Sequence, residues 1–303
     1  MNDYELSIII PHFNDPVGLS ACLASLSRRC RDRYHVEVIV CDNNSDFAPT
    51  GLEEFDLNIK LVVETKRGAG PARNAGVAEA RGEYLAFTDC DCLIDPDFVK
   101  NGLTHMRRNG ERSVLAGKIV YYPKNPHPNY VEAFDIIFAM DQEGHALKGD
   151  AATGNLWTSR SLFTEVGPFV ADVAEDTDWC RRAFTAGAAF QFGADCIVRH
   201  PARATLEELR AKWRRQSAMT FNVHRKQSLF SIRWPLLCAA TALSAIPHSL
   251  KAVRSDKLPR LSDRLKSVLI LFWCRAFRAK IMTGFYLSGQ DRIDPNKYWT
   301  NAS

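Results

Sequence analysis

The sequence predicts an α/β protein whose first 200 residues form a mostly parallel sheet flanked by helices. Short runs rich in β-branched residues alternate with segments whose apolar residues have helical spacing. Several of these runs end directly in a cluster of polar residues. Strands that alternate with helices in this way build a parallel sheet of Rossmann type, which binds ligands at the carboxyl ends of its strands.

Four strands are expected in the first 90 residues, with helices between them. The strands are Leu6–Ile10, Val36–Asn43, Ile59–Glu64 and 83–89. Helices are expected from Asp15 or Pro16 to Cys30, over 70–82 and over 96–110, the last two ending at a glycine.

Beyond Ser113 the order of elements changes. A strand at 113–122 precedes an insertion, residues 130–147, that is expected to be helical or mobile. A strand or turn at 155–160, a helix at 176–187 and a strand at 189–200 follow. We therefore expect a catalytic domain over residues 1–203 and a helical C-terminal region over residues 204–303.

The cysteines and the N-terminus bear on the cellular compartment. Nine cysteines are scattered over 303 residues, and an odd number cannot be fully paired. Reduced thiols in a cytoplasmic setting fit better, and the first apolar run, Leu6–Ile10, is too short for a signal peptide. Cys90 and Cys92 are one residue apart, which is not the CxxC spacing of redox or zinc sites.

The net charge of +4 hides a division between the two regions. Residues 201–303 hold 19 Lys and Arg against 6 Asp and Glu, a charge of +13, so the first 200 residues carry −9. From its charge alone, a basic region of this kind meets a membrane face, a nucleic acid or an acidic partner, or it is a solvated helical surface. No nucleic acid is expected as the partner.

Two apolar runs in the C-terminal region raise the question of membrane contact. Pro235–Ile246 and Val268–Cys274 are each shorter than the ~20 apolar residues that a spanning helix needs. Flanking Lys and Arg, with Trp234 and Trp273 nearby, are typical of helices in a membrane interface. The alternative is that these helices pack against the catalytic domain.

Four polar loops should meet at the carboxyl edge of the sheet. They are PHFND after the first strand, CDNNSD after the second, TKRGAGPARNAG after the third and TDCDC after the fourth. Asp42 can accept hydrogen bonds from a base or a ribose, or it caps its own turn. Arg73 and Asn74, on the helix after a glycine-rich turn, suit a base or a phosphate.

The pair Asp89-x-Asp91 carries most information about chemistry. In an extended segment the two carboxylates point to the same side, where they repel each other unless a cation relieves them. Hard oxygen ligands suit Mg²⁺ or Mn²⁺, which also stabilise a diphosphate leaving group. An acidic turn without metal is the alternative.

Five segments, taken in order, resemble family 2 glycosyltransferases. They are LSIIIPHFND, VIVCDNNSD, GAGPARNAGVAEARGEYLAFTDCD, TGNLWTSRSLFTEVGPF and AEDTDWCRRA, and together they cover about residues 5–200. The resemblance implies the GT-A fold and an inverting transfer of a sugar from a nucleotide-sugar donor. It places the donor on one set of residues, namely Pro11, Asn14, Asp42, Gly68, Arg73 and Asp89.

The resemblance also implies roles around the metal and the acceptor. Asp42 would contact a uracil or related base with help from Arg73, and Asp91 would bind the divalent cation beside Asp89. Asp176 would be the catalytic base, with Glu175 beside it. The acceptor would lie along Thr153, Gly154 and Asn155.

Two further side chains each have two possible roles. Trp157 is a stacking surface for a sugar ring or a core residue. His200 closes on the metal or the diphosphate, or is structural.

Departures from the family pattern narrow the expected reaction. His12 stands where a tyrosine is more usual, and the Q-x-x-R-W signature of processive members is not matched by Lys212–Gln216. We expect addition of one or a few sugars to a saccharide or a polyprenyl-linked glycan at the membrane.

Two other classes compete with this interpretation. A sugar-1-phosphate nucleotidyltransferase would need a glycine-rich basic loop after the first strand, and PHFND offers none. A non-catalytic saccharide-binding protein would not need both Asp91 and Asp176.

Overall fold

The computed structural model describes residues 4–30, 35–171 and 173–298, and the chain divides into two compact units. Unit 1 comprises residues 1–120 and 140–200, and unit 2 comprises residues 121–139 and 201–303. The predicted division of the chain at residue 203 differs from these two units in one respect. Residues 121–139 belong with the C-terminal helices rather than with the catalytic domain.

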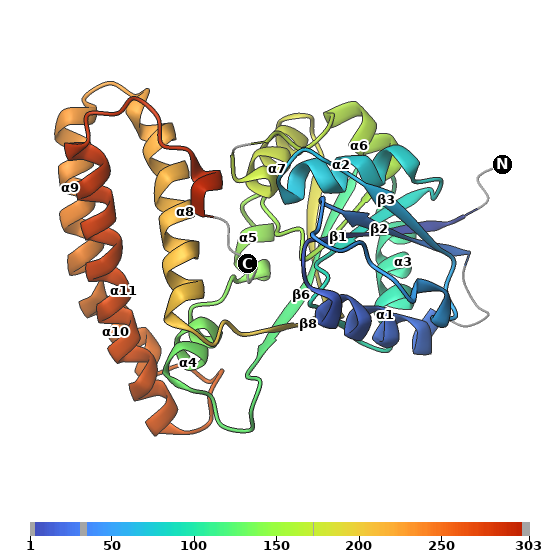
Figure 1. The fold of residues 1–303 in the computed structure, drawn as a ribbon, viewed down its shortest axis with the longest axis horizontal. Coiled ribbons are helices and arrows are strands. Elements are labelled where there is room, and N and C mark those ends of the chain that lie inside the picture. Colours follow the sequence, from blue (N-terminus) through green and yellow to red (C-terminus); the bar gives the residue numbers. More distant parts are fainter. Residues whose placement is uncertain (1–3, 31–34, 172, 299–303) are drawn as a thin grey trace. The chain divides into compact units, whose positions relative to one another are not determined.

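An eight-stranded sheet runs through unit 1 in the order β3-β2-β1-β4-β7-β6-β8-β5 (Figure 1). The strands are β1 (Leu6–His12), β2 (Val36–Asp42), β3 (Ile59–Val63), β4 (Tyr84–Thr88), β5 (Leu93–Ile94), β6 (Ser113–Tyr122), β7 (Asn155–Ser159) and β8 (Ala189–Pro201). The last residues of β6 and β8 fall in unit 2.

The sheet is mixed rather than mostly parallel. Strand β1 pairs in parallel with β2 and β4, and β2 with β3, as predicted. Strand β7, however, pairs antiparallel with β4 and β6, and β5 pairs antiparallel with β8. The change begins where the sequence loses its regular alternation of strand and helix, because antiparallel neighbours need no crossover helix.

Helices cover both faces of the sheet in unit 1 (Figure 1). One face holds α1 (Pro16–Cys30) and α3 (Phe98–Asn109), and the other holds α2 (Ala69–Glu79), α6 (Arg160–Val166) and α7 (Glu175–Thr185). The short helices η1 (Leu52–Glu54) and α5 (Gln142–Ala146) lie in connections. The predicted helices at 70–82 and 176–187 are thus present with slightly earlier ends.

Alternate residues of β1 build the two cores. Ile8 and Ile10 face the core under α1 and α3, whereas Ile9 faces the core under α2, α6 and α7. The close approach of α2 depends on Gly76, where a Cβ would lie 2.4 Å from the sulfur of Cys41. This packing fixes the start of α2, and with it Arg73, against the end of the sheet.

Unit 2 is helical. It contains α4 (Tyr130–Ile137), α8 (Leu206–Arg225), α9 (Phe230–Leu243), α10 (Ala245–Val253), α11 (Leu261–Leu287) and η2 (Pro295–Tyr298). Helix α11 packs on α4, α8, α9 and α10, which explains why residues 121–139 belong with this unit (Figure 1).

A buried ion cluster joins α4 to α8 within unit 2. Asp135 is 1% exposed and lies 3.3 Å from Arg203 and 3.1 Å from Lys212. Burial alone would raise the pKa of Asp135, but the two cations outweigh it and hold that pKa well below its usual range.

One helical segment of unit 2 is longer than the sequence predicted. By length and composition alone, Phe230–Val253 is long and apolar enough to cross a membrane, with a mean hydropathy of 1.4 over its most apolar window. The expectation that no segment reaches this length is wrong, because α9 and α10 continue past the run that ends at Ile246. A single such segment is a weak indication, since buried core helices pass the same test.

Candidate active site

Arg73 lies at the centre of the candidate site in unit 1. It is 3% exposed, and its guanidinium donates to Oδ1 of Asp89 at 2.7 Å and to Oε1 of Glu175 at 3.1 Å. Burial alone would lower the pKa of Arg73, but the charges of Asp89 and Glu175 outweigh burial and raise that pKa above its usual value. The guanidinium group therefore stays protonated. One buried cation therefore connects the loop after β4 with the first turn of α7.

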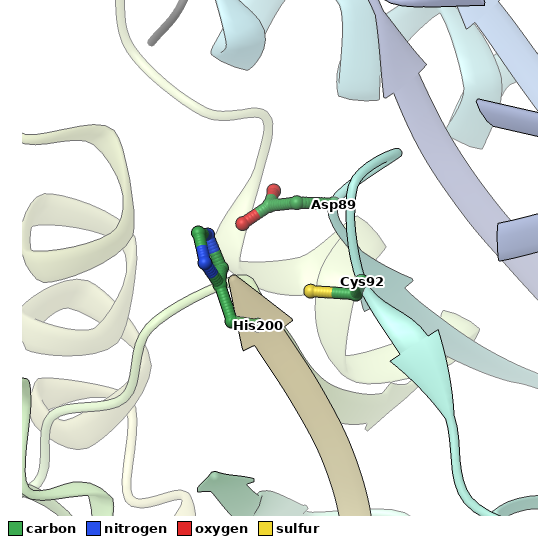
Figure 2. Close-up of side chains that lie close together, drawn as sticks. All are labelled: Asp89, Cys92 and His200. Carbon is green, nitrogen blue, oxygen red and sulfur yellow. The ribbon is translucent and has the colours of Figure 1, made fainter. Parts of the chain in front are cut away.

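The turn after β4 holds a candidate metal site. Ligand atoms of Asp89, Cys92 and His200 all lie within 4.8 Å of one another, and Figure 2 shows these side chains converging from the turn and from β8. Nε2 of His200 also lies 3.6 Å from Oδ1 of Asp91. A Cβ at Gly154 would be 3.1 Å from Asp89, so this segment borders the same carboxylate.

The donor set fits a divalent cation of the Mn²⁺ type. Two carboxylates and one imidazole supply the oxygen and nitrogen ligands that Mn²⁺ accepts, whereas Mg²⁺ prefers oxygen alone. The thiol of Cys92 is a poor ligand, because burial first, and then Asp91 and Asp89, raise its pKa well above the usual value. Asp89, Asp91 and His200 are therefore the residues that would hold the ion.

Asp42 is buried at the end of β2. Its carboxylate is 3% exposed and lies 3.0 Å from Nδ1 of His12. It also accepts hydrogen bonds from the hydroxyl and the backbone N–H of Ser45, at 2.6 and 3.2 Å. Three contacts from two residues thus hold Asp42 in place. Both predicted roles, contact with a base and capping of the turn, depend on this carboxylate.

Two polar loops are tied together beside Asp42. Asn14, with a positive φ of 50°, donates from its side chain to Asp46 at 3.0 Å and accepts from the Asp46 backbone at 2.9 Å. Pro11 pairs with Cys41 in the parallel register, and Gly68, with a φ of 125°, is the N-cap residue directly before α2. The structure thus brings Pro11, Asn14 and Asp42 together, while Gly68 adopts a backbone that a side chain would strain.

Glu175 and Asp176, the carboxylates predicted to face the acceptor, occupy the first turn of α7. Asp176 is half-buried, and burial first, then the charge of Glu175, raises its pKa to about 6. Asp150 adds to this rise, while Arg73 opposes it. A carboxylate with this pKa is mostly ionised at neutral pH and still basic enough to take a proton.

Asn155 and Trp157 do not have the predicted positions for an acceptor contact. Trp157 is fully buried, packs on Phe98 with ring centroids 4.9 Å apart, and donates to Asn155 at 3.1 Å. Asn155 is also fully buried and donates to the carbonyls of Lys118 and Cys196. The stacking role of Trp157 is wrong and its core alternative holds, while Gly154 borders Asp89.

Some members of the site were missed from the sequence. Asp150 lies next to the base candidate, 3.5 Å from the Thr177 hydroxyl, and pairs with His145 at 2.8 Å. Ser45 and His12 together enclose Asp42. No spacing pattern marks Asp150, but the acidic cluster around it is visible once α5 and α7 are placed by the fold.

Comparisons with known proteins identify the family of this chain. The model of Glycosyl transferase family 2 matches residues 7–167, more than half of the chain. The chain belongs to glycosyl transferase family 2. It is therefore a glycosyltransferase, as the five sequence segments predicted.

Relatives of known name point the same way. Glycosyltransferase AglE of Haloferax volcanii is 28% identical over 219 residues, which cover 69% of this chain and 71% of AglE. An Escherichia coli enzyme is 37% identical over 112 residues, 36% of this chain and 44% of that protein. Its name is UDP-Glc:alpha-D-GlcNAc-diphosphoundecaprenol beta-1,3-glucosyltransferase WfgD.

Solved structures confirm the GT-A fold. The mannosyltransferase PcManGT of Pyrobaculum calidifontis, in complex with GDP-Man and Mn²⁺, superimposes with a TM-score of 0.52 at 18% identity. The superposition covers 97% of this chain and 78% of the PcManGT chain. TarS of S. aureus, residues 1–349 in complex with UDP-GlcNAc, also superimposes with a TM-score of 0.52 at 18% identity. That superposition covers 98% of this chain and 79% of the TarS chain.

Proposed function

We propose that this glycosyltransferase inverts the anomeric centre as it moves a sugar from a nucleoside-diphosphate donor to a saccharide hydroxyl. UDP-sugars are the expected donors. The observation that carries the proposal is the bridge from Arg73 to Asp89 and Glu175, which joins the diphosphate side and the acceptor side of one site. Both halves of an in-line displacement can thus be served by neighbouring groups.

The donor half lies along β1, β2 and the turn after β4. Asp42 would accept a hydrogen bond from the base or the ribose, and Arg73 would add positive charge to this half of the site. Asp91, Asp89 and His200 would hold a divalent cation, which when bound neutralises the diphosphate and stabilises it as a leaving group.

The acceptor half depends on Asp176. A sugar hydroxyl is a weak nucleophile, and a carboxylate with a pKa of about 6 takes its proton as the bond to the sugar forms. Attack from the face opposite the diphosphate gives one displacement and one inversion. Glu175, held by Arg73, keeps the pKa of Asp176 high through its charge and fixes the first turn of α7.

The acceptor class follows from the relatives and from the basic C-terminal region. WfgD, by its name, acts on a sugar linked to diphosphoundecaprenol. We infer a saccharide carried on a polyprenyl diphosphate at the cytoplasmic face of a membrane, with one or a few sugars added per acceptor. The mismatch to Q-x-x-R-W supports limited addition.

Donor identity is the first experimental test. The full chain is screened by thermal shift against UDP-, GDP- and dTDP-sugars with and without Mn²⁺, and release of the nucleoside diphosphate is measured for each. We expect a rise in melting temperature that needs both Mn²⁺ and one donor class, with release of that diphosphate. A donor that stabilises equally without metal, or no donor at all, would contradict the proposal.

A further inference from the structure

A group of arginines lies between α8 and α11 in unit 2, and none of them belongs to the candidate active site in unit 1. Arg214 lies with its guanidinium carbon 5.7 Å from the ring centre of Phe277, and Arg278 lies 4.9 Å from that of Trp213. Arg275 is one turn before Arg278 on α11. Aromatic faces thus hold two guanidinium groups in fixed positions along one helix–helix seam.

These three arginines lack an anionic partner among the described residues. No carboxylate there pairs with Arg214, Arg275 or Arg278, and the Nε atoms of Arg275 and Arg278 are buried without a hydrogen-bond acceptor. Burial lowers the pKa of both Arg275 and Arg278, and the charge of Arg275 lowers the pKa of Arg278 further. Both groups are thus partly removed from water with no carboxylate in the described part of the chain paired to them. A buried donor without a partner is costly, which makes an external acceptor favourable.

The acids nearest in sequence are engaged elsewhere. Helix α11 contains one acid, Asp263, which binds Lys266 at 2.7 Å. Twelve residues separate it from Arg275, or about 18 Å along the helix axis. In α8 the two acids occupy the first turn, where Glu207 pairs with Arg210 and Glu208 closes the cap.

Helix α11 and its neighbours α9 and α10 expose apolar side chains. On α11, Leu265, Leu269 and Phe272 follow one another at helical spacing and are 51%, 63% and 48% exposed. On α9 and α10 a second row repeats at helical spacing, comprising Ile232, Leu236, Leu243, Ile246 and Leu250, each at least 59% exposed. Apolar rows beside arginines are typical of helices that lie at a membrane surface.

We propose that Arg214, Arg275 and Arg278 form a binding site for the phosphate of an anionic membrane lipid. The exposed leucines of α11 would contact the acyl chains, and the guanidinium groups would donate to the phosphate oxygens. A lipid explains the site better than a soluble phosphate because Arg275 follows Phe272, the last residue of the apolar row, by one helical turn. The inference deepens the membrane location in the proposed function, but it requires neither the sugar donor nor Asp176.

Vesicle binding of the full chain tests the site. Wild type is sedimented with vesicles of phosphatidylcholine alone, and with vesicles containing 30% phosphatidylglycerol, at about 0.1 M salt. We expect binding only to the second, and Arg275→Gln with Arg278→Gln should weaken it at least tenfold. The matched control, Lys226→Gln with Lys297→Gln, removes the same charge from exposed positions of unit 2 and should change binding by less than threefold.

Two further experiments distinguish a specific lipid-phosphate site from non-specific electrostatic attraction to the vesicle surface. Arg275→Lys with Arg278→Lys keeps the charge and loses the planar fork, so it should still weaken binding several-fold. Inorganic pyrophosphate at 5 mM should leave wild-type binding intact, because it offers no acyl chain.

Three results would overturn the proposal. The first is an equal loss of vesicle binding in the double variant with Arg275→Gln and Arg278→Gln and in its lysine control. The second is full vesicle binding by the double variant with Arg275→Lys and Arg278→Lys. The third is release of the wild-type protein from vesicles by pyrophosphate. Circular dichroism checks that each variant is folded, and diphosphate release from the donor is measured in parallel without vesicles. That release should be unchanged in all variants, so failure of this site is distinguishable from failure of the proposed reaction.

Discussion

Nη1 of Arg73 lies 3.1 Å from Oε1 of Glu175, although 102 positions separate the two residues in the sequence. The second nitrogen of the same guanidinium donates to Asp89. A single side chain thus sets the electrostatics of both the turn after β4 and the first turn of α7. Arg73 was expected to help bind the base, whereas the structure places it between the two acidic groups.

Removal of the Arg73 charge should change the pH dependence as well as the rate. Arg73 lowers the pKa of Asp176, so in Arg73→Gln that pKa should rise above 6, and the acidic limb of the pH–rate profile should move to higher pH. We expect a loss of ~10²-fold in kcat/KM at pH 7 from misplacement of the carboxylates. The control, Arg73→Lys, keeps a charge, so its pH profile should move less. An unchanged profile in the glutamine variant would show that Arg73 does not act on Asp176.

The ionisation of Asp176 should govern activity in mild acid. The base acts as the carboxylate, so the rate should rise with pH through about 6 and level off above 7. Asp150 raises this pKa, and Asp150→Asn should therefore move the acidic limb to lower pH. Steady-state rates from pH 4.5 to 8.5 with saturating donor would check both statements. A shift toward higher pH in the Asp150 variant would contradict the assignment.

Metal affinity should depend on the cluster after β4. Asp91→Asn is expected to raise the Mn²⁺ concentration for half-maximal activity at least tenfold, and His200→Gln to raise it several-fold. The control, Asp97→Asn, removes an exposed acid that makes no capping bond at the start of α3. Free Mn²⁺ measured by electron paramagnetic resonance gives a readout independent of turnover. Equal affinities in the Asp91 and Asp97 variants would exclude Asp91 as a ligand.

The ion cluster in unit 2 should matter for stability rather than for chemistry. Asp135→Asn leaves Arg203 and Lys212 buried without their partner, and we expect a loss of roughly 3–5 kcal/mol in the free energy of unfolding. Asp256→Asn, at an exposed position, should change it by less than ~0.5 kcal/mol. Urea unfolding followed by circular dichroism compares the two.

The same cluster predicts acid sensitivity. Because the folded pKa of Asp135 lies below its unfolded value of about 3.9, its contribution is full above about pH 5 and is lost as the pH falls toward the folded pKa. The difference in stability between wild type and Asp135→Asn should therefore shrink in acid. A difference that stays constant from pH 7 to pH 3 would contradict the lowered pKa.

Much of the site could be predicted because strand ends are readable in sequence. Runs such as Leu6–Ile10 and Val36–Asp42 are apolar until a polar cluster begins, and parallel strands bring those clusters to one edge. The pairing of His200 with Asp91 could not be derived this way, since β8 lies next to β5 only through the antiparallel half of the sheet. Periodicity says nothing about that arrangement.

Trp157 shows a second limit of sequence reasoning. Its neighbours in sequence resemble an acceptor loop, yet β7 pairs on both sides and directs this ring into the core under α3. Gly102 fits against the ring, where a Cβ would lie 2.3 Å away. Only the packing of α3 over β7 distinguishes a stacking surface from a core residue.

The most direct test of the reaction compares wild type with Asp176→Asn in single-turnover transfer. The donor found by the screen is bound first with Mn²⁺, its affinity is measured, and nucleoside-diphosphate release is then followed with acceptor. We predict an unchanged donor affinity and a rate lower by ~10²–10⁴-fold, because only proton removal from the acceptor hydroxyl is lost. Transfer at the wild-type rate by Asp176→Asn would contradict the assignment of Asp176 as the base.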